Sequence, residues 1–132
     1  QPYVVKYIKN TQDEIIKANK PHVLDHVMSP STAERLNAIL TGVVDQGTGR
    51  AAQIKNVKVA GKTGTAQKVV DGQYSHSKFY ATFFGYAPAD NPRIAAIAVF
   101  DEPYPSYYGG TVAAPVFKEV VENTLKYLEN SK

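Results

Sequence analysis

The segment VAGKTGTAQ, residues 59–67, decides how this chain is interpreted, because it places Lys62 between two glycines and follows it with two threonines. Gly61-Lys62-Thr63 matches the end of the phosphate-binding signature G-x-x-x-x-G-K-[ST]. Asn56, however, stands where that signature requires its first glycine. The residues that follow are rich in β-branched side chains, whereas a phosphate loop leads into a helix. We therefore predict a β-strand over about 57–70 and do not expect nucleotide binding.

Side chains on a strand alternate between its two faces. The hydroxyls of Thr63 and Thr65 are therefore expected on one face, and the amine of Lys62 on the opposite face. Gly64, between the threonines, has no side chain to obstruct a ligand that lies against the backbone. At the edge of a sheet, this strand is suited to take up a peptide as an added strand, with the two hydroxyls meeting a carboxylate.

The composition is that of one globular domain, with 132 residues of which 43% are hydrophobic and 11% aromatic. Its fifteen basic residues are scattered among twelve acidic ones, without the basic stripe of a nucleic-acid-binding protein, so no nucleic-acid partner is expected. The absence of cysteine excludes disulfides and cysteine-based zinc sites. The longest apolar run, residues 94–100, is too short to span a bilayer. The start at Gln1-Pro2 shows no signal peptide and suggests a piece of a longer protein.

The hydrophobic pattern predicts an α/β fold of the α+β type, an antiparallel sheet with helices packed on it. The expected elements are an N-terminal hairpin at about 3–18, a helix at about 30–46, strands at about 57–70, 79–87 and 92–101, and a helix at about 112–129.

Each predicted helix has an apolar stripe. The first begins either with Ser29 as cap and Pro30 at its first position, or with Ser31 and Glu34 as a capping box. Its stripe consists of Leu36, Ile39, Leu40, Val43 and Val44. The stripe of the last helix, which is expected to cover one face of the sheet, consists of Ala113, Val116, Phe117, Val120, Val121, Leu125 and Leu128.

Lys62-Thr63-Gly64-Thr65 resembles the KTG(T/S) box of the penicillin-binding proteins and serine β-lactamases. Further segments resemble class B penicillin-binding transpeptidases in the same order along the chain, namely residues 45–52, 84–89, 107–110 and 113–117. The resemblance covers nearly the whole chain. It implies that residues 1–132 are a single partial domain, the C-terminal half of the transpeptidase fold.

The resemblance also implies a role for each residue of the box. Lys62 resembles the lysine that contacts the serine of the S-x-N motif and supplies positive potential to the substrate carboxylate. Thr63 and Thr65 resemble the residues that bind that carboxylate, with Gly64 between them, and the backbone N–H of Thr65 resembles an oxyanion-hole donor. The implied reaction is acyl transfer, in which a serine attacks the D-Ala-D-Ala end of a peptidoglycan stem peptide, and β-lactams trap the acyl-enzyme. No cofactor and no metal are implied.

The nucleophile of that reaction is expected to lie outside this chain. One S-x-x-K sequence occurs, Ser75-His76-Ser77-Lys78, but it follows the KTG box and falls in an expected hairpin connection. No S-x-N sequence occurs. The missing N-terminal half of the domain is therefore the expected partner, and the chain alone is not expected to acylate.

The family implies a parent protein anchored to the bacterial cytoplasmic membrane, with this domain on the extracytoplasmic side. The alternative is a catalytically silent fragment that binds a carboxylate or a protein and that folds alone or associates with itself.

Several polar or aromatic groups have simpler interpretations. His22 and His26 are expected as a surface pair and not as a zinc site. Asp101 and Glu102, adjacent on a strand, should point to opposite faces, and they are expected as structural or surface charges and not as a general-acid pair. For Tyr104, Tyr107 and Tyr108, lining a cleft and packing the connection to the last helix remain equally open.

Overall fold

The computed structural model describes residues 3–130, so the start at Gln1-Pro2 lies outside the described residues. The chain forms two compact units, which divide between Ala33 and Glu34. The sequence predicts one partial domain over residues 1–132 and does not distinguish these units. Within the described range, no helix is both long and apolar enough to cross a membrane.

The first unit contains an antiparallel hairpin of β1 (Tyr7–Lys9) and β2 (Ile15–Ala18), inside the predicted range 3–18. Its turn is held by Asn10, whose side-chain oxygen accepts the backbone N–H groups of Gln12 and Glu14 at 3.0 and 2.9 Å. This is the local side-chain bonding that favours asparagine in turns. Every residue of both strands is exposed.

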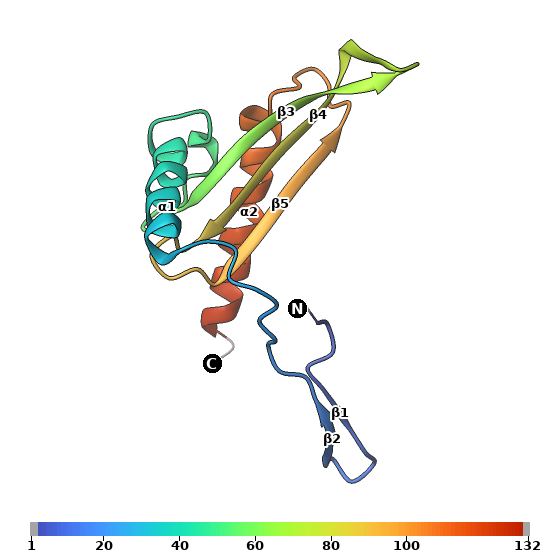
Figure 1. The fold of residues 1–132 in the computed structure, drawn as a ribbon, viewed down its shortest axis with the longest axis vertical. Helices are drawn as coiled ribbons and strands as arrows, with labels where there is room; N and C mark the ends of the chain where they lie inside the picture. Colours follow the sequence, from blue (N-terminus) through green and yellow to red (C-terminus); the bar gives the residue numbers. More distant parts are fainter. Residues whose placement is uncertain (1–2, 131–132) are drawn as a thin grey trace. The chain divides into compact units, whose positions relative to one another are not determined.

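The second unit is built on a three-stranded antiparallel sheet in the order β3-β4-β5 (Figure 1). The strands are β3 (Ala60–Val70), β4 (Gln73–Ala87) and β5 (Ile94–Asp101). The helix α2 (Gly109–Asn130) packs against the sheet. The predicted α+β class, an antiparallel sheet covered by a helix, is confirmed.

The core lies between α2 and one face of the sheet. The ring of Phe117 on α2 meets that of Phe83 on β4, with their centroids 4.8 Å apart, and both side chains are buried. The buried residues of α2 recur at intervals of four and are mainly Ala113, Phe117, Val121 and Leu125. Val116 and Val120 were predicted in this stripe but are exposed, because they lie one position off this line.

The opposite face of the sheet exposes apolar side chains. Because residues directly opposite in neighbouring strands share a face, the pairs Phe84↔Ile97 and Thr82↔Val99 place these residues together. We call this surface the bare face and define it by Tyr80, Phe84, Ile97 and Val99, which are 39%, 46%, 64% and 56% exposed.

The helix α1 (Pro30–Asp45) begins with Ser29 as its cap and Pro30 at its first position, which was the first of the two predicted alternatives. The backbone N–H of Thr32 donates to Ser29 Oγ at 3.2 Å. Of its predicted stripe only Val44 is buried, and Leu36 and Ile39 are exposed. A short 3₁₀ segment, η1 (Arg50–Ala52), follows and contacts α2.

Three elements of the second unit begin three or more residues away from their predicted starts. The strand predicted from 79 begins at Gln73, because Asp71-Gly72 alone makes the turn, both with positive φ, as tight hairpins require. The strand predicted from 57 begins at Ala60, because Ile54 and Val57 pair with each other around a separate turn. The last helix begins at Gly109 instead of 112.

Candidate carboxylate-binding site

The two threonines of β3 lie on the face of the sheet that α2 covers. Thr63 is opposite Phe83 and Thr65 is opposite Ala81, and both partners are buried on that face. In the described residues β3 pairs with β4 only, so it is an edge strand. The alternation predicted from the sequence therefore brings both hydroxyls to one side of an available strand edge.

A pocket of about 440 Å³ opens beside these hydroxyls. Thr48, from the loop after α1, has its Oγ1 2.7 Å from Thr63 Oγ1. Gly109, the first residue of α2, donates its backbone N–H to Thr65 Oγ1 at 3.3 Å. The residues lining the pocket are Thr48, Arg50, Ala51, Thr63, Thr65, Tyr108, Gly109, Gly110 and Thr111.

The hydrogen-bonding state of these groups leaves two hydroxyl protons for a ligand. Thr65 Oγ1 accepts the N–H of Gly109, so its own proton is free to be donated. One of the Thr48 and Thr63 hydroxyls donates its proton to the other, and the accepting hydroxyl keeps its own proton for a ligand. The N-terminus of α2 adds positive potential, and Arg50 is a cationic residue in the lining. The pocket is thus suited to a carboxylate.

Lys62 lies on the opposite face, as predicted, opposite Phe84. Its Nζ donates to the carbonyl oxygen of Thr63 at 2.9 Å, and the side chain is exposed. The ammonium is therefore next to the strand edge and remains accessible to a further partner.

A sequence model of the penicillin binding protein transpeptidase domain matches residues 1–122. The chain belongs to this family. Within the segment predicted as the KTG box, Lys62-Thr63-Gly64-Thr65, Thr63 and Thr65 line the pocket in this structure.

Individual relatives agree with this assignment. Stage V sporulation protein D of Bacillus subtilis is 37% identical over 96% of this chain and 20% of its own length. The probable peptidoglycan D,D-transpeptidase PenA of Neisseria flavescens is 44% identical over 77% of this chain and 26% of its own length. The chain thus spans about a fifth to a quarter of these relatives.

Solved structures of penicillin-binding proteins share the fold. Penicillin-binding protein 3 of Mycobacterium tuberculosis, complexed with ampicillin, matches with a TM-score of 0.79 and 31% identity, over 95% of this chain and 30% of that chain. The apo transpeptidase domain of Burkholderia pseudomallei penicillin-binding protein 3 matches with a TM-score of 0.73 and 43% identity, over 85% and 35%. The predicted transpeptidase fold is confirmed.

Gly64 also makes room within the sheet. A Cβ at Gly64 would collide with Thr82 Oγ1 on β4, so the glycine accommodates that side chain, and the room it leaves for a ligand stays a prediction. A second close approach occurs at Gly110, where a Cβ would collide with the carbonyl oxygen of Thr48. The glycine pair that starts α2 therefore lets the helix N-terminus reach the pocket.

The sequence alone did not assign Thr48 and Arg50 to the site. Both belong to the segment 45–52, which resembled the family but carried no stated role. Their position follows from the chain passing from α1 through η1 to β3, which no local pattern specifies. The sequence signal that was available is a polar Gly-Thr-Gly-Arg run directly after a helix.

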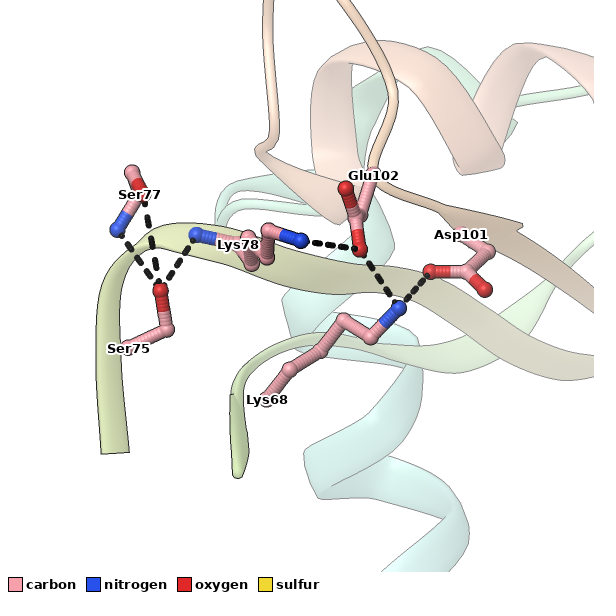
Figure 2. A network of polar contacts seen from close by, with 6 residues as sticks. All are labelled: Lys68, Ser75, Ser77, Lys78, Asp101 and Glu102. Carbon is pink, nitrogen blue, oxygen red and sulfur yellow. Dashed lines mark hydrogen bonds and ion pairs between the residues drawn. The ribbon is translucent and has the colours of Figure 1, made fainter. Parts of the chain in front are cut away.

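The S-x-x-K sequence lies inside β4, which corrects the predicted hairpin connection (Figure 2). Ser75 Oγ accepts the backbone N–H groups of Ser77 and Lys78 at 3.2 and 3.1 Å. Lys78 Nζ instead lies 3.7 Å from Glu102 Oε1. The lysine amine is thus drawn toward a carboxylate on the next segment.

Asp101 and Glu102 approach the same cation, which corrects the opposite faces predicted from strand alternation and agrees with the expectation of structural charges. Lys68 Nζ donates to Asp101 Oδ1 and to Glu102 Oε1, both at 2.7 Å (Figure 2). Glu102 has φ +49°, so the backbone leaves the strand there and returns the second carboxylate to the same side. The hydrogen bond from Lys68 holds the pKa of Glu102 below its ordinary value. Hydrogen bonds to Asp101 and then Glu102 raise the pKa of Lys68.

The three tyrosines before α2 differ from one another. The ring of Tyr107 stacks on Phe79 with centroids 4.2 Å apart, whereas Tyr108 lines the pocket. Tyr104 is 95% exposed. The two alternatives left open by the sequence therefore each describe one tyrosine.

Within residues 3–130 there is no cluster of three metal-ligating side chains, and His22 and His26 remain outside any such group.

Proposed function

We propose that this chain is the KTG-bearing part of a peptidoglycan D,D-transpeptidase and that its pocket holds the terminal carboxylate of a D-Ala-D-Ala stem peptide. The observation that carries this proposal is the convergence of Thr63, Thr65 and Thr48 with Arg50 at the N-terminus of α2. Two free hydroxyl protons match the two oxygens of a carboxylate, and charge-assisted hydrogen bonds are the stronger kind.

The strand edge supports the remaining steps. A substrate peptide added beside β3 would place its scissile carbonyl next to the box, where the backbone N–H of Thr65 serves as an oxyanion donor. One such donor lowers the barrier by about 2.7–4 kcal/mol in other hydrolases. Lys62, exposed at the same edge, is available to the serine of an S-x-N motif and adds positive potential. Acyl transfer releases D-alanine, and an amine of a neighbouring stem peptide resolves the acyl-enzyme.

We place the nucleophile, its base and the S-x-N serine on the N-terminal half of the domain, which is the partner of this chain. The contacts of Ser75 support this assignment, because its oxygen accepts two backbone N–H groups while Lys78 faces Glu102. A serine nucleophile needs a base within hydrogen-bond reach of its hydroxyl. Alone, this chain should not acylate.

The parent protein would bind β-lactams and would be held at the bacterial cytoplasmic membrane, with this domain on the extracytoplasmic side. The ampicillin complex of the M. tuberculosis relative supports the first part of this proposal. Peptidoglycan is the substrate named for PenA, and that protein supports the choice of substrate here.

Fluorescent penicillin followed by denaturing electrophoresis tests this function. The 14.4 kDa chain alone should remain unlabelled. Mixed with the N-terminal half of its parent, it should enable labelling of that partner. Thr65→Val should slow the labelling roughly ten- to hundredfold, since a hydrogen bond to a charged group is lost. Thr124→Val, which removes a hydroxyl bonded within α2, is the matched control.

Two outcomes would contradict the proposal. Stable labelling of the chain alone that disappears with Ser75→Ala, but not with Ser106→Ala, would show that the nucleophile is present. Equal labelling rates for Thr65→Val and Thr124→Val would remove the carboxylate pocket from the mechanism.

The bare face favours a second candidate, a silent fragment that associates with itself. Phe84, Ile97 and Val99 are exposed together on one side of the sheet, and exposed apolar patches mark interfaces. Sedimentation separates the candidates, because a fragment of this kind forms dimers at micromolar concentration and does not change when the N-terminal half is added.

A further inference from the structure

An ion-pair network lies at the end of the sheet where β3 finishes (Figure 2), and its lysine, Lys68, follows Thr65 by three residues on that strand. Lys68 of β3 bridges Asp101 and Glu102 at the end of β5, with both N···O distances 2.7 Å. Its side chain is 19% exposed, and its Nζ also lies 4.9 Å from the centre of the Tyr80 ring on β4. Exposed ion pairs contribute little to stability, but this cation is mostly covered and has two carboxylate partners.

We propose that Lys68 is a positioning residue for the carboxylate pocket. By holding Glu102 it fixes the segment 102–108, and this segment sets where Tyr108 and Gly109 stand beside Thr65. The inference rests on the proposed function of the pocket. It assigns a role in that function to Lys68, a residue of β3 that does not line the pocket.

The first step of the argument is the attachment of the segment to the sheet. Glu102 leaves the strand at φ +49° and donates its backbone N–H to the carbonyl oxygen of Phe79 at 2.9 Å. A residue other than glycine adopts positive φ at a cost, so the surrounding contacts must hold it. Lys68 holds the Glu102 carboxylate, and Lys78 approaches the same oxygen at 3.7 Å.

The second step is aromatic packing from the sheet to the pocket. The ring of Phe79 stacks on Tyr107 with an interplanar angle of 12°. Tyr107 in turn meets Tyr108, with ring centroids 4.6 Å and hydroxyl oxygens 3.4 Å apart. Close packing of aromatic rings favours particular relative orientations of the rings. The segment is therefore held at both of its ends.

The third step is the start of α2. The carbonyl oxygen of Tyr108 accepts the backbone N–H groups of Thr111 and Val112 at 2.9 and 3.0 Å. Gly109, which directly follows Tyr108, donates its own backbone N–H to Thr65 Oγ1 at 3.3 Å. A shift of the segment thus moves the wall of the pocket and the first N–H group of the helix together.

Nuclear magnetic resonance of the 132-residue chain tests the proposal with two separate readouts. The first is the set of nuclear Overhauser contacts between the Phe79 and Tyr107 rings, with the amide shift of Gly109. The second is the affinity for N-acetyl-D-alanyl-D-alanine, followed at the amides of Thr63 and Thr65. Lys68→Met should abolish the ring contacts, move the Gly109 amide and weaken the affinity about fivefold or more.

Controls separate positioning from general damage. Lys68→Arg, which keeps the charge and two donors, should restore both readouts. Lys126→Met breaks a 2.9 Å ion pair within α2 and should change neither. Glu102→Gln should reproduce the Lys68→Met result.

Persistence of the ring contacts and of the Gly109 shift in a folded Lys68→Met chain would overturn the proposal. If instead the unmodified chain fails to bind the dipeptide, the proposed pocket function fails, and the ring contacts still decide whether Lys68 positions the segment. If Lys68→Met does not fold, Glu102→Gln carries the same comparison, and unchanged contacts in it would overturn the proposal.

Discussion

The two faces of the β3-β4-β5 sheet differ in how far this chain completes them. On one face, α2 buries Phe83 and brings its N-terminus to the threonines of the KTG box. On the other face, Lys62 is exposed beside the apolar side chains of Phe84 and Ile97. Because side chains alternate along β3, Thr63 and Thr65 face a pocket formed within this chain, whereas Lys62 faces a surface that the described residues leave exposed.

The two faces also differ in how their polar groups are held. The hydroxyls have partners within the chain, at Thr48 and Gly109, whereas the ammonium of Lys62 contacts the neighbouring carbonyl of Thr63. Contacts within this chain therefore position the two threonine hydroxyls for a ligand, whereas the Lys62 ammonium has, within the described residues, only a contact with the adjacent residue. We therefore expect substitutions on the two faces to have different kinds of consequence.

The largest expected effect is on the covered face. Phe117→Ala should destabilise the chain by about 3–5 kcal/mol, because it leaves a cavity against Phe83. Phe84→Ala, on the bare face, should cost less than about 1 kcal/mol. Urea unfolding followed by circular dichroism measures both. If Phe117→Ala does not fold, Phe117→Leu should still cost more than Phe84→Ala, and equal costs would contradict the contrast between the faces.

A smaller effect is expected where α1 reaches the end of β4. Tyr86 donates its hydroxyl to Asn37 Oδ1 at 2.9 Å, and Asn37 Nδ2 donates to the carbonyl oxygen of Ala89 at 3.0 Å. Asn37→Ala leaves both groups without these partners and should cost about 1–3 kcal/mol in urea unfolding. Asn123→Ala, an exposed position on α2, is the control. A cost no greater than that of the control would show that α1 is not fixed to the sheet at this point.

The pH dependence of the Lys68 network should be visible at acid pH. Lys68 lowers the pKa of Glu102 in the folded chain. The ion pair therefore stabilises the fold above the pKa of an unfolded glutamate, and this stabilisation is lost as the pH falls through the lowered pKa of folded Glu102. The charged groups near this carboxylate are Lys68, Lys78 and Asp101. The ring contacts of Tyr107 should therefore survive below the ordinary glutamate range and then disappear. In Glu102→Gln this acid transition should be absent, and its persistence there would assign it to another group.

The smallest effect on stability, with a clear effect on association, is expected at the centre of the bare face. Ile97→Lys should change the free energy of unfolding by no more than about 0.5 kcal/mol, since the side chain is 64% exposed. Binding of a hydrophobic dye and any dimer in sedimentation should nevertheless decrease. Val120→Lys, at an exposed apolar position of α2, should leave both unchanged. Equal decreases in the two variants would show that the bare face is not a distinct interface.

Much of the fold could be predicted from local patterns. The period of two in β3 placed Thr63 and Thr65 together, and turn residues between the strands indicated antiparallel neighbours. The failures have local causes as well. Positive φ at Asp71 and Gly72 shortened the predicted connection to one tight turn, and Glu102 left the strand where alternation was assumed to continue. Backbone changes of this kind depend on tertiary contacts that a periodic pattern does not contain.

The sequence by itself determined the family and the alternation that separates Thr63 and Thr65 from Lys62, because these follow from motifs and from the geometry of a strand. Only the tertiary structure decided that Thr48, Arg50 and Gly109 complete the pocket and that Lys68 joins β3 to the end of β5. The pocket residues are brought together by the packing of α2 on the sheet and of η1 on α2. Contacts between residues so distant in the chain arise from the burial of the shared core, which the local sequence around each residue does not record.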